Sequence, residues 1–475
     1  MVDEVLRQFR SLADIPRATF HEEACAEYIA RKGIEYGCKV EHDGKNNVMI
    51  DKPAHPGHEH RPLIILQAHM DMVCKKTPGC LYDPLQDGIR LVEDEGKITA
   101  DGTTLGADNG IGAAIILEIL HGLVPCGPVR GIFTVEEEQG MGGAKSLDAS
   151  WLKGAYFISL DWTSTHTSCI GCAASRVIQV KKNLKWCPPK HDTAFRLELS
   201  GLPGGHSGLD IGQVRHNAIC EMVRILQNIQ LLGIHIELAH MEGGTAGNVI
   251  PDSCKCTVVV TMDKADELTE LIEDMDSHLD TVSRLEKGSV RLTAYKAKQP
   301  GKVLVHKCMK EVLDFIQSVP GGVLKPLPYD GGPVKLSANT GKVSVDEDMS
   351  LLIMARGDDE QQLDAYYSRI QYQALRYHMM PEQISKEPGF TSGPDGKLIR
   401  KVCAIYREQN DEELVLEAVH AGLECGYFKQ KNPELELIVL GADLIDIHTT
   451  GETLYTDRLG VLCSLLAELL GTFEE

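Results

Sequence analysis

The first 185 residues alternate between short hydrophobic runs and segments in which apolar residues recur with helical spacing. Apolar runs at 63–68, 131–135 and 155–160 predict buried strands. Helical spacing at 22–36 and 110–121 predicts helices between them. This order is typical of an α/β fold with a parallel or mixed sheet.

The pattern changes near residue 190, where apolar and polar residues begin to alternate. Strands and helices are then expected in the order β-α-β-β-α-β, which favours a ferredoxin-like unit. The expected strands are 195–200, 234–239, 254–262 and 290–295, and the expected helices are 217–232 and 266–285. A helix at 306–319, a strand at 349–354 and a helix at 360–378 extend this unit.

The last part of the chain returns to apolar helices at 414–425 and 460–470, around a strand at 435–440. We therefore predict a lid domain that is inserted into a discontinuous catalytic domain. The predicted parts are 1–187 and 383–475 for the catalytic domain and 188–382 for the lid.

Composition and charge disfavour a nucleic-acid-binding protein and a membrane protein. The 475 residues carry a net charge of −21, which disfavours nucleic acids and anionic membranes as partners. No apolar run approaches the roughly 20 residues of a membrane span, and the N-terminus lacks the apolar core of a signal peptide. The 15 scattered cysteines favour reduced thiols. We therefore expect a cytoplasmic protein that binds neither nucleic acid nor membrane.

Candidate metal-site residues stand at the end of the first apolar strand, where open α/β sheets bind ligands. His69 and Asp71 are two positions apart and can face the same side of a strand. Asp71 is placed to accept the second ring N–H of a metal-bound His69. The alternative is a histidine that is satisfied by its neighbours.

Further acidic residues follow at a turn and at a strand end. Asp108 lies in a glycine-rich turn, where it could cap a helix or bridge two cations. Glu137 and Glu138 follow the next apolar strand, so that one could bind metal while the other accepts a proton from water. The alternative is a surface charge run that begins at Glu136.

Two more candidates complete the set. Asp161 ends the third apolar strand, and His448 lies in a short turn near the C-terminus. Two histidines and several carboxylates suit a two-metal hydrolytic site, and zinc is the default ion for mixed nitrogen and oxygen ligands.

The ordered motifs resemble the co-catalytic zinc peptidases related to carboxypeptidase G, carnosinase and peptidase T, and most closely their aminoacyl-histidine dipeptidase branch. The matching motifs are His69-x-Asp71, Gly-Ala-Asp108-Asn-Gly, Glu137-Glu138-x-Gly140, Asp161, His448, Thr103–Gly112, Gly204–Gly208, Ser337–Gly341 and Gly422–Gly426. Matches extend from about residue 12 to the C-terminus. The resemblance implies a phosphorylase/hydrolase-like α/β catalytic domain with a mixed sheet and an inserted ferredoxin-like α+β lid.

The resemblance also implies roles for the site residues. Glu137 is the general base, Asp71 supports His69, and the bond between Asp108 and Asn109 is a cis peptide. The implied ligands are His69, Asp108 and Asp161 for one zinc, and Asp108, Glu138 and His448 for the other. Asp108 would thus bridge two zinc ions, for which cobalt or manganese could substitute.

In the lid, the resemblance implies that His206 stabilises the oxyanion and that Arg356 grips the C-terminal carboxylate of the substrate. Asn248 and Asn339 are the other implied substrate-binding residues. The implied assembly is a homodimer through the lid.

The implied activity is hydrolysis of dipeptides by a water activated between two zinc ions. A preference for Xaa-His dipeptides, with carnosine-like substrates included, is implied by the resemblance alone. A tripeptidase, a carboxypeptidase or an N-acyl amidohydrolase would keep the same metals and remains an alternative. A non-catalytic metal- or peptide-binding protein is disfavoured because Glu137 and all five ligands are present.

Overall fold

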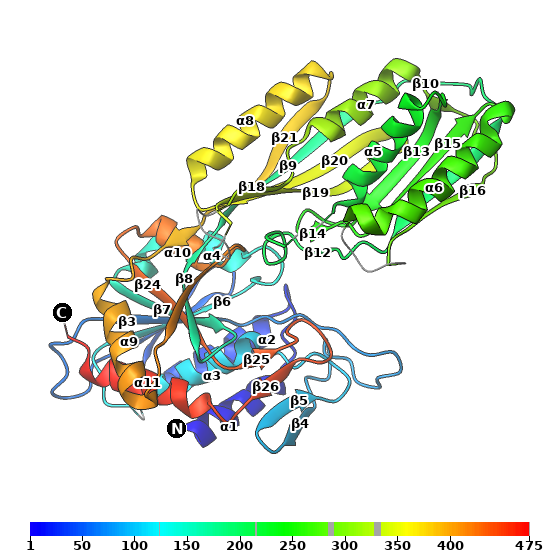
Figure 1. Ribbon diagram of the computed structural model, residues 1–475. Coiled ribbons are helices and arrows are strands. Elements are labelled where there is room, and N and C mark those ends of the chain that lie inside the picture. The colour runs from blue at the N-terminus through cyan, green and yellow to red at the C-terminus, as the bar shows by residue number, and fades with distance from the viewer. Residues whose placement is uncertain (123, 214–215, 284–288, 327–333, 475) are drawn as a thin grey trace. The chain divides into compact units, whose positions relative to one another are not determined.

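The chain folds into two compact units. The computed structural model describes residues 1–122, 124–213, 216–283, 289–326 and 334–474. Unit 1 comprises Met1–Cys172, Phe390–Ala418 and Leu423–Glu475, and unit 2 comprises Ala173–Gly389 and Val419–Gly422. Unit 2 corresponds to most of the green and yellow ribbon in Figure 1.

A nine-stranded mixed sheet forms the centre of unit 1, in the order β1-β2-β6-β3-β7-β24-β8-β22, with β23 paired to β8. β3 (Ile64–His69) lies between β6 (Val129–Thr134) and β7 (Tyr156–Trp162) and is parallel to both. All 6 residues of β3 are buried, as expected for a parallel strand covered on both faces. The carboxyl ends of these three strands meet at one edge of the sheet, and the expected α/β class with a mixed sheet is confirmed.

Helices cover both faces of this sheet. α3 (Ala107–His121) packs on β3, β6 and β7, with α1 (Val2–Ala13) packed against it. α10 (Cys425–Lys431) covers the other face, where Phe428 lies against Phe157 with ring centroids 5.0 Å apart.

The remaining elements of unit 1 frame this core. They are α2 (Glu23–Glu35), α4 (Gly142–Ser146), α9 (Lys397–Asn410), α11 (Leu459–Thr472), β1 (Lys39–His42), β2 (Val48–Lys52), β4 (Leu91–Asp94), β5 (Lys97–Ala100), β8 (Thr167–Cys172), β22 (Phe390–Thr391), β23 (Val415–Val419), β24 (Glu436–Gly441), β25 (Leu444–Ile445) and β26 (Thr453–Tyr455).

Unit 2 is built on a second nine-stranded sheet, in the order β16-β11-β15-β13-β19-β20-β9-β21, with β18 paired to β19. The expected β-α-β-β-α-β order is present as β11, α5, β13, β15, α6 and β16. α5, α6, α7 and α8 pack against the sheet (Figure 1). The bounds are β9 (Ala174–Asn183), β10 (Trp186–Cys187), β11 (Thr193–Ser200), β12 (Gly205–His206), α5 (Ala218–Leu231), β13 (Glu237–Gly244), β14 (Val249–Ile250), β15 (Cys254–Val260), α6 (Ala265–Ser283), β16 (Arg291–Lys296), β17 (Val303–Leu304), α7 (His306–Ser318), β18 (Gly322–Lys325), β19 (Leu336–Val345), β20 (Asp348–Gly357), α8 (Glu360–Arg376) and β21 (Met380–Glu387).

The expected helix at 414–425 is wrong. The chain forms strand β23 there, passes through residues 419–422 of unit 2, and begins α10 at Cys425. Leu, Glu and Ala give this segment helical propensity, but pairing of β23 with β8 overrides it.

The boundaries between the units also differ from the expected ones. β9 pairs with β20 and β21, so it belongs to unit 2, and the first boundary lies at 172/173 instead of 187/188. The second lies at 389/390 instead of 382/383, because β21 extends to Glu387. The last two residues of the helix expected at 266–285 lie outside the described residues.

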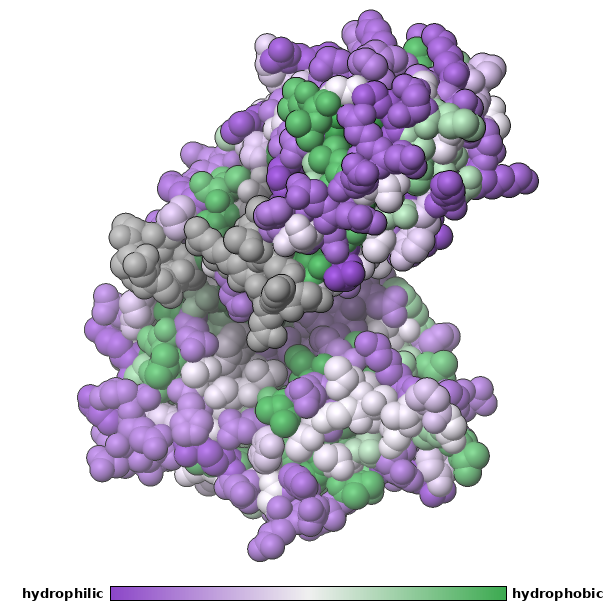
Figure 2. Space-filling view, turned by 45° about the vertical axis from the view of Figure 1, so that its right-hand side comes forward, coloured by the Kyte–Doolittle hydropathy of each residue, from purple (hydrophilic) through white to green (hydrophobic). Residues whose placement is uncertain are grey.

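The visible surface is mainly hydrophilic (Figure 2). Within the described ranges, no helix has both the length and the hydrophobicity that crossing a membrane requires.

Candidate metal centre

A single carboxylate lies between two imidazoles at the carboxyl edge of the unit 1 sheet. Asp108 Oδ1 is 3.1 Å from His69 Nε2, and Asp108 Oδ2 is 3.1 Å from His448 Nε2. His69 ends β3, Asp108 lies in the first turn of α3, and His448 lies between β25 and β26. Each oxygen of Asp108 therefore faces a different histidine.

One further carboxylate accompanies each histidine. Asp161 Oδ1 is 3.7 Å from His69 Nε2, and Glu138 Oε2 is 3.0 Å from His448 Nε2. In each of the two resulting triads, the three potential ligand atoms lie within 4.8 Å of one another. The triads share Asp108 and are His69, Asp108 and Asp161, and Asp108, Glu138 and His448.

This donor set fits two cations. Zinc bonds of about 2.0–2.2 Å in tetrahedral geometry put ligand atoms about 3.3–3.6 Å apart, close to the spacings in both triads. Glu138 Oε1 is buried and has no hydrogen-bond partner among the described residues, which a cation would provide. Imidazoles with carboxylates are typical zinc ligands.

The carboxylates of the cluster raise the pKa of both histidines. Burial disfavours the charged form of His69, but hydrogen bonds to Asp108, Asp161 and Asp71 outweigh it and hold the His69 pKa well above its usual value. Hydrogen bonds to Asp108 and Glu138 raise the pKa of His448 to about 10. Without a cation, protons on the two imidazoles offset the negative charge of the carboxylates. A bound cation would take over this role, so cation binding would release protons.

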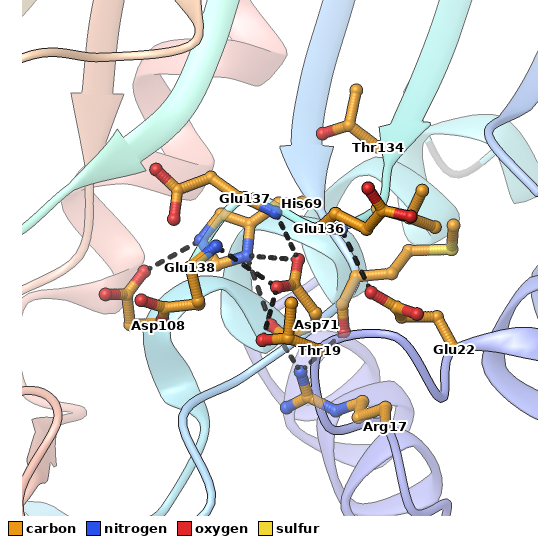
Figure 3. A network of polar contacts seen from close by, with 12 residues as sticks. Arg17, Thr19, Glu22, His69, Asp71, Asp108, Thr134, Glu136, Glu137 and Glu138 are labelled. Carbon is orange, nitrogen blue, oxygen red and sulfur yellow. Dashed lines mark hydrogen bonds and ion pairs between the residues drawn. The ribbon is translucent and has the colours of Figure 1, made fainter. Parts of the chain in front are cut away.

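Asp71 connects His69 to the backbone of the two glutamates (Figure 3). Its Oδ1 accepts from the Glu137 N–H at 3.0 Å, and its Oδ2 accepts from the Glu138 N–H at 3.1 Å. His69 Nδ1 lies 3.1 Å from the backbone carbonyl oxygen of Asp71 and 3.5 Å from its Oδ1, and Thr19 Oγ1 donates to its Oδ2 at 3.0 Å. Asp71 therefore fixes the orientation of His69 and of the turn that carries both glutamates.

The three consecutive glutamates have different environments. Glu136 pairs with Lys45 Nζ at 2.7 Å, as a surface acid does. Glu138 contacts His448, whereas the carboxylate of Glu137 has an oxygen within 4.8 Å of ligand atoms of both His69 and Glu138. Burial, with the charges of Asp161 and Glu138, raises the pKa of Glu137 well above its usual value. A carboxylate with a raised pKa accepts a proton more readily, which suits a general base.

The resemblance-based expectation about the backbone is confirmed, because the Asp108–Asn109 peptide bond is cis.

The hydrogen bonds of His206, which belongs to unit 2, define which ring nitrogen carries the proton. Its Nδ1 accepts from the backbone N–H groups of Gly208 and Leu209 at 3.3 and 3.2 Å. Burial and the charge of Arg356 lower the pKa of His206, which favours the neutral ring. Because Nδ1 accepts, the neutral ring carries its proton on Nε2 and can donate from there.

The other three unit 2 candidates differ in burial. Asn248 is exposed, whereas Asn339 and Arg356 are buried. The side-chain amide of Asn339 donates to the carbonyls of Gly247 and Val249 at 2.9 and 2.7 Å. Asn339 therefore holds the loop that carries Asn248.

Three buried titratable residues lie outside the site residues that the sequence predicts. Glu452 accepts hydrogen bonds from the turn that carries Asp108, and Glu424 Oε2 accepts from Gln67 Nε2 and Thr134 Oγ1, both at 2.7 Å. In unit 2, His420 Nε2 lies 2.8 Å from Ser337 Oγ. Burial, with the charges of Arg356 and His206, lowers the His420 pKa to about 4. The Gly422–Gly426 motif contains Glu424 and begins two positions after His420, so it was the available signal for these two residues.

Comparison with known proteins gives the same family as the motifs. The sequence profile of Peptidase family M20/M25/M40 matches residues 65–472. The cytosol non-specific dipeptidase of Escherichia coli is 31% identical over 467 residues, which cover 97% of this chain and 96% of that protein.

Solved structures extend this similarity. The aminoacylhistidine dipeptidase of Vibrio alginolyticus is 29% identical with a TM-score of 0.86, and the match covers 99% of this chain and 97% of that one. The aminopeptidase PepT of Bacillus cereus is 15% identical with a TM-score of 0.57 over 99% of this chain and 98% of that one, which shows a shared fold.

Proposed function

Because the chain belongs to Peptidase family M20/M25/M40, and is thus a hydrolase acting on peptide bonds, we propose that it is a two-metal dipeptidase. The observation that carries this proposal is the carboxylate of Asp108 between His69 and His448, with Asp161 and Glu138 completing two triads. The similar proteins from Escherichia coli and Vibrio alginolyticus are both named dipeptidases.

Two cations in these triads would polarise the scissile carbonyl and lower the pKa of the attacking water. We assign zinc to both sites because of the mixed nitrogen and oxygen donors. Glu137 takes the proton of the water and later delivers it to the amine that leaves. Its burial keeps the proton at this carboxylate between the two steps. Asp71 holds Glu137 in place through the backbone N–H.

Unit 2 supplies the proposed substrate contacts, so that it would act as a lid. His206 Nε2–H donates to the oxygen that gains charge as the carbonyl is attacked. The guanidinium of Arg356 binds the C-terminal carboxylate of the substrate through paired N–H donors. Asn248 orients the peptide, and Asn339 contributes through the loop that it holds.

We propose a preference for Xaa-His dipeptides, a cytoplasmic location and a homodimer through unit 2. The edge strand β21 supports the dimer, because Met380 is 53% and Ile384 is 49% exposed there. Met380→Lys combined with Ile384→Lys should shift the molar mass measured by light scattering from dimer to monomer.

A substrate panel on zinc-loaded protein tests the activity. The panel contains carnosine, Gly-His, Leu-Leu, a tripeptide and an N-acetylated amino acid. We expect hydrolysis of free dipeptides that stops with a chelator and returns with zinc. Turnover restricted to the tripeptide or to the N-acetylated amino acid would favour a tripeptidase or an amidohydrolase, and absence of turnover with bound zinc would favour a binding protein.

A further inference from the structure

A buried glutamate from the C-terminal part of the chain binds the turn that carries Asp108. Glu452 Oε2 accepts from the backbone N–H groups of Leu105 and Gly106, both at 2.9 Å. Its Oε1 accepts from the backbone N–H of Asp108 at 3.1 Å. Glu452 is 3% exposed, so these three hydrogen bonds form away from bulk water.

Arg17 also holds the same turn. The guanidinium donates through Nη2 to the Gly106 carbonyl and through Nη1 to the Met70 carbonyl at 2.9 Å. Gly106 has a φ of +69°, and a Cβ there would lie 2.7 Å from Arg17 Nη2 and 2.5 Å from Met72 Sδ. The turn therefore has little freedom between Arg17 and Glu452.

A carboxylate suits this position because three N–H donors converge on it. The first N–H groups of a helix have no partner within the helix. Asp108 lies in the first turn of α3, Gly106 is the N-cap of α3, and Leu105 precedes it. A carboxylate offers two oxygens that only accept, so every donor is satisfied. In a glutamine, an NH₂ group would replace one of the two oxygens, so that a donor would face a backbone N–H donor.

We propose that Glu452 is a positioning residue that aims the carboxylate of Asp108 at both histidines and thereby sets the affinity for both cations. This inference rests on the proposed two-metal site. Glu452 follows His448 by four positions, so one short segment provides a ligand and the support of the bridging ligand.

Zinc titration of chelator-treated protein by calorimetry tests the inference. Wild type should bind two ions. Glu452→Gln should weaken zinc binding about 10–100-fold, the usual effect of losing a group that orients a metal ligand. Glu452→Asp keeps both accepting oxygens on a shorter side chain and should lose less zinc affinity than Glu452→Gln. If Glu452→Gln does not fold, the zinc affinity of Glu452→Asp tests the positioning role instead.

Glu436 provides the matched control, because its Oε1 accepts from the backbone N–H of Ile399 at 3.1 Å within the same unit. Glu436→Gln should lower the melting temperature of the metal-free protein without changing zinc affinity. If Glu452→Gln behaves in the same way, with wild-type zinc affinity, the positioning role is wrong while the two-metal site stands. If wild type itself binds no zinc, the proposed function fails instead.

Discussion

His448 Nε2 lies 3.1 Å from Asp108 Oδ2, although the two residues are 340 positions apart in the chain. The same carboxylate reaches His69 with its other oxygen. Two parts of unit 1 that are far apart in the sequence therefore supply the ligands: the first 172 residues and the C-terminal part. Both triads depend on the side chain of Asp108.

Asp108→Ala should reduce the zinc content from two ions per chain to less than one. The reason is that the variant removes one ligand from each triad. Asp161→Ala removes a ligand from one triad and should leave one ion tightly bound. Metal content after gel filtration, measured by mass spectrometry, distinguishes the two variants; two ions retained by Asp108→Ala would contradict the shared ligand.

The strand-end residues could be predicted from sequence because burial leaves a clear signal. β3 is apolar except for Gln67 before it ends in His69, and a polar side chain at the carboxyl end of a buried strand indicates a ligand site. Asp161 at the end of β7 follows the same rule. The parallel pairing of β3 with β6 and β7 then brings these ends together.

Supporting residues could not be predicted in this way. Glu452 and Glu424 act through hydrogen bonds to groups more than 250 positions away in the chain, so no local pattern shows which groups they bind. The segment at 414–425 forms a strand instead of the expected helix because its pairing with β8 is likewise a tertiary contact. Local periodicity carries no information about such contacts.

His206→Ala should lower kcat about 10²–10³-fold, the usual effect of removing an oxyanion donor, while zinc content stays at the wild-type level. His216, which pairs with Glu221 at 3.3 Å in unit 2, is the control, and His216→Ala should keep wild-type kcat. Steady-state kinetics on both variants provide the measurement. A wild-type kcat for His206→Ala would rule out the oxyanion role.

Arg356→Lys should raise KM for free dipeptides at least about tenfold, because a lysine cannot bind a carboxylate through paired donors. The same substitution should change little for dipeptides with an amidated C-terminus, which lack the carboxylate. Comparing kcat/KM for both substrate forms tests this. An equal loss for the two forms would mean that Arg356 does not recognise the carboxylate.

Glu424 should make the stability of the metal-free protein depend on pH. Burial raises the Glu424 pKa from its ordinary 4.5 to about 8, so the folded state binds a proton that the unfolded state has lost between these values. Its contribution is thus complete below pH 4.5 and is lost as pH rises towards 8. A glutamine at this position does not titrate.

Glu424→Gln should therefore gain stability relative to wild type as pH rises from 5 to 8, by at least about 1.4 kcal/mol, the equivalent of one pKa unit. Urea unfolding of both proteins at the two pH values measures this difference. A constant difference between wild type and variant would show that Glu424 does not titrate in this range.

The most direct test of the two-metal peptidase mechanism is a paired measurement of kcat and zinc content on Glu137→Gln. The amide keeps the shape of the side chain but cannot take the proton of the attacking water. We expect two zinc ions per chain and a kcat about 10²–10⁴-fold below wild type. Loss of zinc together with activity would make Glu137 a ligand, and wild-type kcat with both ions bound would contradict the mechanism.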